Sequence, residues 1–401
     1  MTLEADAVVS PPVAPRFRVA FLFNHEGMHQ LAHTAPVAGW LARESDIEVT
    51  LITSSAALAD RCREVIGPNG AALRTTVLPE SIMQRFLAGA LDKVMPFSRL
   101  ANLVRFRAML ATFDAIVVPE RTSLFLKRLL GERCPKLVHI KHGSGDRAQG
   151  FQPQIGMFDF LLLSGRKMVD RLLAQGTIRE GQYAIIGYPK FDLIKARQRL
   201  PLFDNDRPVV VYNPHPDAYL SSYFRFGHAV LEYFRANPAY NLIFAPHLML
   251  YKRRVHISLP HWRVRLRPDF LEEFRSVDNI HIDTGSPRSS DMSYTLSADI
   301  YLGDVSSQVY EFLSWPRPCV FLNAHGARWQ SDPNYLVWQT GPVVSDIAGL
   351  GAALSLSINE HATRYQPIQQ RLFDDTMSLT DQPSGQRAAA ALREYLERVR
   401  S

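Results

Sequence analysis

The sequence predicts an α/β protein with two Rossmann-like, doubly wound domains that face a central cleft. Short apolar runs of strand length alternate with longer amphipathic stretches over most of the 401 residues. Runs of this kind separated by helices are typical of a parallel sheet that is covered on both faces. The alternation stops at a polar, proline-bearing segment, residues 198–208, and then starts again, which indicates a linker between two domains.

The first half contains six candidate strands. They are RVAFLF from Arg18, EVTLIT from Glu48, AIVVP from Ala115, KLVHIKH from Lys136, FDFLLLS from Phe158 and AIIGY from Ala184. Amphipathic stretches such as PVAGWLARE and RKMVDRLLAQG lie between them and predict covering helices. We therefore expect a flexible tail over residues 1–15 and a first domain over residues 16–197.

The second half repeats the pattern. It contains the runs VVVYNP, NLIFAPH, NIHID, ADIYLGD and PCVFLN and a helical pattern over Tyr223–Ala236, which predict a second domain over residues 208–366. The segment GQRAAAALREYLERVR combines strong helix formers with i, i+4 charge pairs, so we expect a helical tail over residues 367–401. Ligands of open parallel sheets bind beyond the carboxyl ends of the strands, so polar residues directly after the apolar runs are the candidates for a site.

Composition narrows the class of protein. The net charge of +6 favours anionic partners. The three cysteines, Cys62, Cys134 and Cys319, include no CxxC pair, which argues against a disulfide framework or a thiolate metal site and favours a reducing compartment. The first residues carry acids instead of the basic start of a signal peptide, and no window approaches 18 consecutive apolar residues. We expect a cytoplasmic protein, soluble or peripheral on the inner face of the cell membrane.

The turn after ADIYLG has residues suited to phosphate binding. Asp304, Ser306 and Ser307 precede a helix expected over residues 308–315, and the N–H groups and dipole at a helix start favour an anion. Glu311 lies one helical turn after Ser307, within reach of ribose hydroxyls. An ordinary helix cap is the alternative interpretation, because Asp and Ser are favoured capping residues.

His142 ends the run KLVHIKH and is followed by Gly143, Ser144 and Gly145. An imidazole at a strand end faces the cleft, and its ordinary pKa suits a general base. The glycines let a substrate approach the backbone closely. The alternative is a turn with a capping histidine.

Three further strand-end residues are candidates for the cleft. His247, in NLIFAPH, could donate to a phosphate oxygen, and His215, in VYNPHPD, has the same chemistry. Both are also compatible with satisfied structural histidines. Lys190, in GYPKFD, could face a bound donor, or its segment could simply turn the chain towards the linker.

The segment His25–His29 matches the HExxH pattern of zinc proteases, and His33 continues its i, i+4 spacing. That chemistry needs both histidines on one face of a settled helix, whereas this segment directly follows a strand and contains Gly27. We interpret it as a polar first loop, with His25 as a substrate contact or a rival base. The sequence predicts no metal ligands, and it leaves dependence on a divalent metal open.

Two basic stretches bear on partners. Ser81–Phe113 mixes large apolar residues with five cations and a single acid, Asp92, which resembles an interfacial helix pair on an anionic membrane and equally resembles core-facing helices. The stretch RRVHISLPHWRVRLRP from Arg253 is basic with one Trp, but no nucleic-acid-binding motif accompanies it. We expect no nucleic-acid partner.

Four short motifs, in order, resemble the CDP-glycerol glycerophosphotransferase family, GT-B-like enzymes of teichoic-acid-type polymer synthesis. ADIYLGDVSSQVYEFLSWPRPCVFLN resembles the family's strand, Asp-Tyr-Ser-Ser, acid-bearing helix and next strand. KHG, GYPKFD and APH resemble its Trp-His-Gly, Gly-Tyr-Pro-Arg-Asn-Asp and Arg-Pro-His-Pro. The similarity spans about Lys141 to Asn323 and is vague before that.

The resemblance implies roles for the matching positions. His142 is similar in position to the proposed catalytic histidine, and His247, Ser306 and Ser307 would hold the donor's phosphates. Asp304 would orient that turn and Glu311 would approach the ribose. The first domain would then be the acceptor side and the second the donor side. The sequence departs from the family in each of the four motifs, at positions that carry Lys141, Phe191, Ala245 and Val305. Loss of an Arg at Ala245 removes a bidentate phosphate contact, which leaves other donors open.

The expected function is the transfer of a glycerol phosphate, or a similar polyol phosphate, from a CDP-linked donor to an acceptor hydroxyl, with release of CMP. The acceptor expected is a lipid- or polymer-linked alcohol. The alternatives are a GT-B glycosyltransferase or sugar-nucleotide epimerase that uses a UDP-sugar, and a degenerate module that binds nucleotide without turnover.

Overall fold

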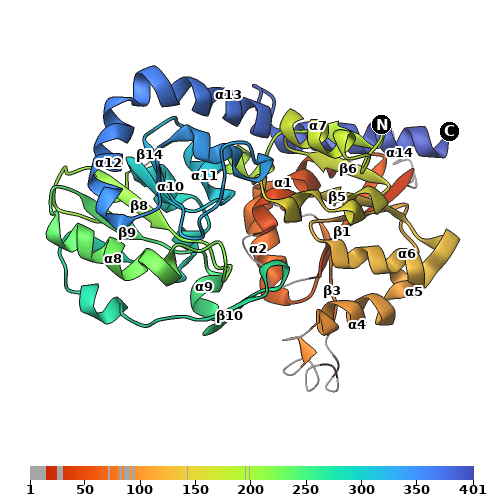
Figure 1. Ribbon diagram of the computed structural model, residues 1–401. Helices are drawn as coiled ribbons and strands as arrows, with labels where there is room; N and C mark the ends of the chain where they lie inside the picture. The colour runs from red at the N-terminus through yellow and green to blue at the C-terminus, as the bar shows by residue number, and fades with distance from the viewer. Residues whose placement is uncertain are drawn as a thin grey trace, which may run out of the picture.

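The structure is a computed structural model in which the described residues are 15–24, 30–70, 73–79, 81, 84, 91–92, 95–141, 143–194, 196–197 and 199–401 (Figure 1). Residues 1–14 of the expected tail, the HExxH segment with His25, and His142 lie outside these ranges. Much of the segment 82–94, in the first of the two basic stretches, also lies outside them.

Seven parallel strands form the first sheet, in the order β3-β2-β1-β4-β5-β6-β7. They are β1 (Phe17–Phe23), β2 (Ile47–Thr53), β3 (Arg74–Val77), β4 (Ala115–Val118), β5 (Lys136–Ile140), β6 (Phe160–Leu163) and β7 (Tyr183–Ile185). The sequence predicts every strand except β3, whose RTTV is too polar to stand out. Both faces of β1 are buried, with Val19 and Phe21 in one core cluster and Ala20 and Leu22 in another.

Helices cover both faces of this sheet. They are α1 (Leu31–Leu41), α2 (Ala56–Ile66), α4 (Phe97–Arg105), α5 (Arg107–Leu110), α6 (Phe125–Leu130) and α7 (Arg166–Ala174). Helices α1 and α2 bury their apolar side chains in one cluster, and α4 to α7 bury theirs in the other.

Six parallel strands form the second sheet, in the order β12-β9-β8-β13-β14-β15. They are β8 (Val209–Asn213), β9 (Asn241–Phe244), β12 (Ile280–Ile282), β13 (Ile300–Gly303), β14 (Cys319–Leu322) and β15 (Val343–Val344). Its main helices are α8 (Tyr223–Ala236), α9 (Met249–Lys252), α10 (Ser293–Ser297), α11 (Gln308–Phe312), α12 (Leu350–Asn359) and α13 (Gln366–Met377). When the strands of each sheet are numbered along the chain, the second sheet runs 3-2-1-4-5-6, and the first runs 3-2-1-4-5-6 with a seventh strand added at its edge. Both therefore contain the Rossmann order. The predicted fold class is confirmed.

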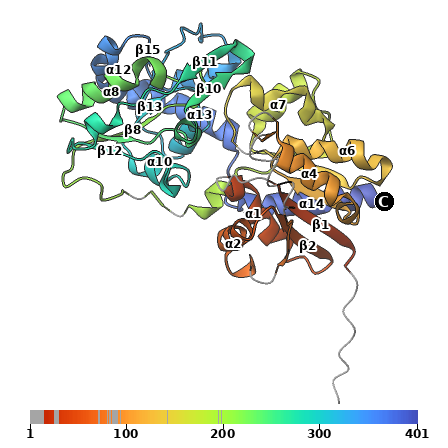
Figure 2. The ribbon, with the colours of Figure 1, turned by 90° about the horizontal axis from the view of Figure 1, so that it is seen from below.

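The sequence does not predict where the last helix packs. Helix α14 (Ser384–Arg400) returns to the first half, where Ala388, Leu392 and Leu396 join the core cluster of β1, α1 and α2. Figure 2 shows α14 beside β1 and α1, on the opposite side of the molecule from β8 and β12. Its N-terminal residues Ser384 and Gly385 donate their backbone N–H groups to the Asp192 carboxylate at 2.8 and 2.6 Å. The chain therefore returns from α13, whose Leu372, Phe373 and Met377 pack in the core of the second half, to the first half.

An antiparallel hairpin, β10 (Val255–Ser258) and β11 (Arg263–Leu266), projects from the second half. Among the described residues, no helix combines the length and the apolar character that a membrane span requires.

Candidate active site

A cavity of about 560 Å³ lies between the two halves. Its walls are built mainly by residues that directly follow the carboxyl ends of strands, as expected for parallel sheets. From the first half these include Glu120, Arg121, Lys141, Gly143, Gly145, Arg147, Tyr188 and Lys190, and from the second half His247, Ser289, Ser290, Ser307, Gln308 and Glu311.

Asp146 fixes the first half against the second. Its buried carboxylate forms an ion pair of 2.6 Å with Lys167 from its own half. The Tyr310 hydroxyl on α11 and the Val337 backbone N–H, both from the second half, donate to it at 2.7 and 2.8 Å. These contacts join the loop that carries Asp146 to the second half at one end of the cavity.

Gly143 and Gly145 lie directly against Ser307. Gly143 has a φ of +73°, in the left-handed region that favours glycine. A Cβ atom at this position would lie 3.2 Å from Ser307 Oγ, and one at Gly145 would lie 3.4 Å from the Ser307 N atom. Gly143 follows His142 in the chain, so the loop of the predicted base meets the predicted donor-binding turn, although His142 itself is outside the described residues.

Lys190 and Glu311 form a buried ion pair across the two halves. Lys190 Nζ lies 2.7 Å from Glu311 Oε1 and donates to the Ser290 carbonyl oxygen at 2.8 Å. Only 5% of Lys190 and 4% of Glu311 is exposed. Burial raises the pKa of Glu311, and the Lys190 ammonium opposes that rise. The second carboxylate oxygen, Oε2, is buried and accepts no hydrogen bond from any described residue.

Lys141 contributes a second group that lacks a hydrogen-bond partner among the described residues. Its Nζ atom is buried, has no hydrogen-bond partner among the described residues, and lies 4.8 Å from the centre of the Phe151 ring. Gly150 faces it so closely that a side chain at position 150 would collide with the ammonium. Burial, followed by the nearby cations Lys167 and Arg171, lowers the pKa of Lys141 to about 7. A buried cation beside other cations favours a bound anion.

Two other polar atoms in the cavity wall are also unsatisfied among the described residues. They are Ser289 Oγ and Gln308 Oε1. The Gln308 amide nitrogen donates to the Ser289 carbonyl oxygen at 3.1 Å, and the amide oxygen takes no part in this contact. Together with Lys141 Nζ and Glu311 Oε2, the cavity offers one cationic donor, one hydroxyl and two acceptor oxygens. That set suits a ligand that is both anionic and rich in hydroxyls.

Four of the predicted site residues that the structure describes are not part of the cavity wall: Asp304, Ser306, Ser144 and His215. Asp304 is fully buried and accepts the backbone N–H groups of His215 and Ser222 at 2.8 and 3.0 Å, so it organises the loop after β8. Burial raises the pKa of Asp304 to about 7, and these hydrogen bonds oppose the rise. Ser306 Oγ accepts the Gln308 N–H at 3.3 Å, and Ser144 Oγ donates to Ser164 Oγ at 2.6 Å.

The two histidines of the second half lie together. Their ring centres are 5.9 Å apart, and His247 lines the cavity while His215 lies behind it. His247 Nδ1 accepts the Met249 N–H at 3.2 Å, which leaves Nε2 as the atom able to donate. Burial, Arg147 and His247 together lower the pKa of His215, so His215 is neutral.

Helix α11, which follows the predicted phosphate-binding turn, spans only Gln308–Phe312. It is three residues shorter than the expected 308–315, so its dipole is weak.

Sequence reasoning did not identify Lys141, Ser289, Gln308 or Arg147 as site residues. Lys141 lies inside the predicted run KLVHIKH, whereas in the structure β5 ends at Ile140 and Lys141 directly follows it. Its place next to the predicted strand end was the available signal. The other three lie in loops or on a helix face whose neighbours come from the opposite half. Local pattern carries no information about such neighbours.

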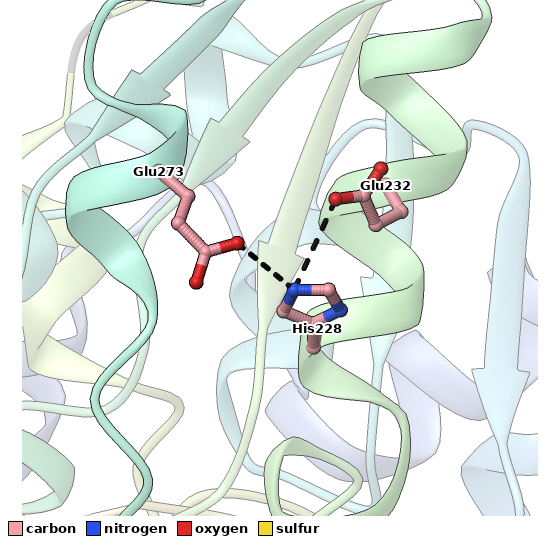
Figure 3. A group of neighbouring side chains, drawn as sticks. All are labelled: His228, Glu232 and Glu273. Carbon is pink, nitrogen blue, oxygen red and sulfur yellow. Dashed lines mark hydrogen bonds and ion pairs between the residues drawn. The ribbon is translucent and has the colours of Figure 1, made fainter.

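Among the described residues, one group of side chains has spacing suited to a metal ion, and it lies on the surface of the second half. His228 Nε2 lies 3.2 Å from Glu273 and 3.9 Å from Glu232, as Figure 3 shows. None of the three lines the cavity. The His228 ring already contacts both carboxylates, and exposed groups of this kind are common without a metal.

No protein-family model matches the chain, and no curated protein matches it. Solved structures do. MnaA of S. aureus, in a structure with UDP, is 12% identical with a TM-score of 0.61, covering 96% of this chain and 98% of its own. The wall teichoic acid polymerase TagF, soaked with CDPG, is 14% identical with a TM-score of 0.58, covering 97% and 91%. The UDP-GlcNAc 2-epimerase of Neisseria meningitidis, bound to UDP-GlcNAc, is 14% identical with a TM-score of 0.56, covering 95% and 100%. At these identities the similarity establishes a shared GT-B fold over nearly the whole chain.

Proposed function

We propose that this protein is a GT-B transferase that binds a nucleotide-linked donor in the cavity between its halves. The main observation in support is a set of buried polar atoms in the cavity that have no hydrogen-bond partner among the described residues. The most important of them are Lys141 Nζ and Glu311 Oε2. A nucleoside diphosphate brings negative charge for the ammonium and ribose hydroxyls for the carboxylate oxygen. Solved proteins of the same fold have been captured with UDP, CDPG and UDP-GlcNAc, which supports this ligand class.

The reaction we propose is transfer of a polyol phosphate from a CDP-linked donor. His142 takes the proton of an acceptor hydroxyl, whose oxygen attacks the β-phosphorus of the donor. The bond between that phosphorus and the bridging oxygen breaks, and the electron pair leaves with CMP. Lys141, Ser307 and His247 stabilise charge on the phosphates, which is most of what phosphoryl transfer requires.

A UDP-sugar reaction at the anomeric carbon is the second candidate. Two of the compared structures hold UDP or UDP-GlcNAc, and Ala245 removes the arginine that the CDP-glycerol family motif carries. Product analysis separates the two candidates, since phosphate transfer releases CMP whereas glycosyl transfer releases a nucleoside diphosphate.

The test begins with thermal melting in the presence of CDP, CMP, UDP and GDP, because a ligand that binds only the folded state raises the melting temperature. The stabilising nucleotide then selects the donor, which is incubated with lipid-linked and soluble alcohols. We expect CDP to stabilise most and CMP to accumulate. Stabilisation without consumption of any donor would instead indicate a nucleotide-binding module and would overturn the proposed transfer.

The pH dependence of nucleotide binding follows from Lys141. Its pKa of about 7 in the free protein lies far below its ordinary value, and an anion binds the protonated ammonium more tightly. Affinity for CDP is therefore highest below pH 7 and falls by up to about tenfold per pH unit above it. Calorimetric titration on both sides of pH 7 measures this. Lys141→Met should flatten the profile, whereas the matched variant Lys127→Met, whose ammonium pairs with Asp159, should keep it.

A further inference from the structure

The outer face of the β10–β11 hairpin is an exposed apolar surface. Cross-strand register pairs Val255 with Leu266 and Ile257 with Val264, so these four side chains share one face. Leu259 and Trp262 extend that face at the hairpin tip. The six side chains are between 51 and 89% exposed, with Trp262 the most exposed. An apolar face of this size on a projecting element marks an interaction site.

The inner face of β10 holds the hairpin in place. The buried His256 ring interacts through Nδ1 with the Pro216 carbonyl oxygen at 3.0 Å and through Nε2 with the Leu250 carbonyl oxygen at 3.1 Å. At the tip, the His261 ring stacks on Tyr219 with 3.9 Å between ring centres. The orientation of the outer face is therefore built into the fold.

The charged residues of the hairpin and its two ends all carry positive charge. From Lys252 to Arg267 the chain carries six Lys or Arg residues and no Asp or Glu. Arg253 and Arg254 precede β10 and are exposed. Arg263 and Arg265 of β11 are also exposed and pair in register with Ser258 and His256, so they lie on the other face of the hairpin from the apolar side chains. Their long side chains can reach past the edge of the hairpin to the headgroup layer. A partner that covers the hairpin must therefore offer an apolar environment for aliphatic side chains and negative charge for the cations.

We propose that the β10–β11 hairpin inserts its outer face into an anionic membrane surface. Such a bilayer presents hydrocarbon beneath a negatively charged headgroup layer, and Trp prefers the boundary between them. A second copy of this chain would bring six cations against six, which opposes self-association. Nucleic acid would satisfy the cations but offers little to four aliphatic side chains, since single strands bind by aromatic stacking.

The first half presents a similar surface on the same side. Figure 1 shows α4 and the hairpin along the lower side of the molecule, one from each half. Helix α4 carries the exposed Arg105 next to the exposed Val104. It belongs to the stretch Ser81–Phe113, for which the sequence leaves open a membrane contact or a core-facing helix pair. In the proposed arrangement both surfaces meet one bilayer, and the hairpin is the contact on the second half.

Co-sedimentation with vesicles tests the proposal directly. We expect the full chain to bind vesicles of phosphatidylcholine with phosphatidylglycerol, to bind phosphatidylcholine alone much more weakly, and to be released by salt. Each Arg near the surface contributes about fivefold, so Arg263→Glu/Arg265→Glu should lower affinity at least about 25-fold. The control variant is Arg128→Glu/Arg133→Glu, which makes the same charge change at two exposed residues of the first half. It should lower the affinity for anionic vesicles less.

A second variant reports on insertion independently of charge. The tryptophan emission of the parent should shift to shorter wavelength on adding anionic vesicles, and Trp262→Phe should abolish most of that shift. The reference Leu379→Ser alters an exposed apolar residue elsewhere and should leave it unchanged. Equal vesicle binding by the parent and the Arg263→Glu/Arg265→Glu variant would overturn the proposal. The proposal would also be overturned if that variant lost binding to DNA but still bound vesicles as the parent does.

Discussion

His142→Ala is expected to reduce turnover by about 10²–10⁴-fold, the usual effect of removing a general base. Nucleotide affinity should stay within about twofold, because the charged and hydroxyl-binding groups of the cavity are left intact. The measurement is kcat with a consumed donor, together with the melting shift produced by the preferred nucleotide. His142 follows a strand end and precedes Gly143, which lies against Ser307, and this neighbourhood is the reason for choosing it.

His228→Ala is the matched control, since it removes an imidazole that belongs to a surface cluster. It should leave turnover unchanged. Near-normal turnover in His142→Ala would show that another group removes the proton, and His247 would then be the residue to change next. A loss of nucleotide binding in step with turnover would mean that His142 binds the donor instead.

Lys190→Met is expected to destabilise the protein by about 3–5 kcal/mol, because it leaves the buried Glu311 carboxylate without its cation. The free energy of unfolding from a urea titration measures the effect. The loss should be largest where the carboxylate is ionised and should shrink at low pH, where protonation removes the uncompensated charge. An assay of nucleotide binding by the same variant reports separately on the cavity.

The double variant Lys190→Met/Glu311→Leu should recover most of the lost stability, since an apolar pair of similar volume replaces the ion pair. It should not recover nucleotide affinity, because it also removes the Glu311 oxygen that accepts the ribose hydroxyls. Arg364→Met, which breaks an exposed ion pair with Glu360, is the control and should leave unfolding nearly unchanged. Equal stability of the single variant and the parent would mean that Lys190 and Glu311 are not a coupled pair in solution.

The sequence predicts the strands well where the apolar run is long. All seven residues of β1 lie in a sheet whose two faces are both buried, so the run itself is the signal. The short strands β3 and β15 carry no such run and were not predicted. The alternation in Arg263–Leu266 is the period of a strand, but the connecting Leu-Pro-His-Trp lacks the usual hairpin turn residues.

Site residues were predictable to the extent that they follow strands. Lys190, His247, Ser307 and Glu311 line the cavity, while Asp304, Ser306, Ser144 and His215 support the loops behind it. Both groups look alike in sequence, because a polar residue after a strand serves either purpose. The direction of the side chain depends on which backbone N–H groups lie near it, as the contacts of Asp304 show.

Apolar periodicity along the chain by itself determined two parallel sheets and, with them, the strand ends at which a ligand would bind. Periodicity is a local property, so it survives in a single sequence. The tertiary structure alone decided that α14 packs on the first half, that Lys190 neutralises Glu311 from 121 positions away, and that no described residue accepts a hydrogen bond from Lys141 Nζ. Desolvation and pairing of charge depend on neighbours brought together by folding, which no local pattern specifies.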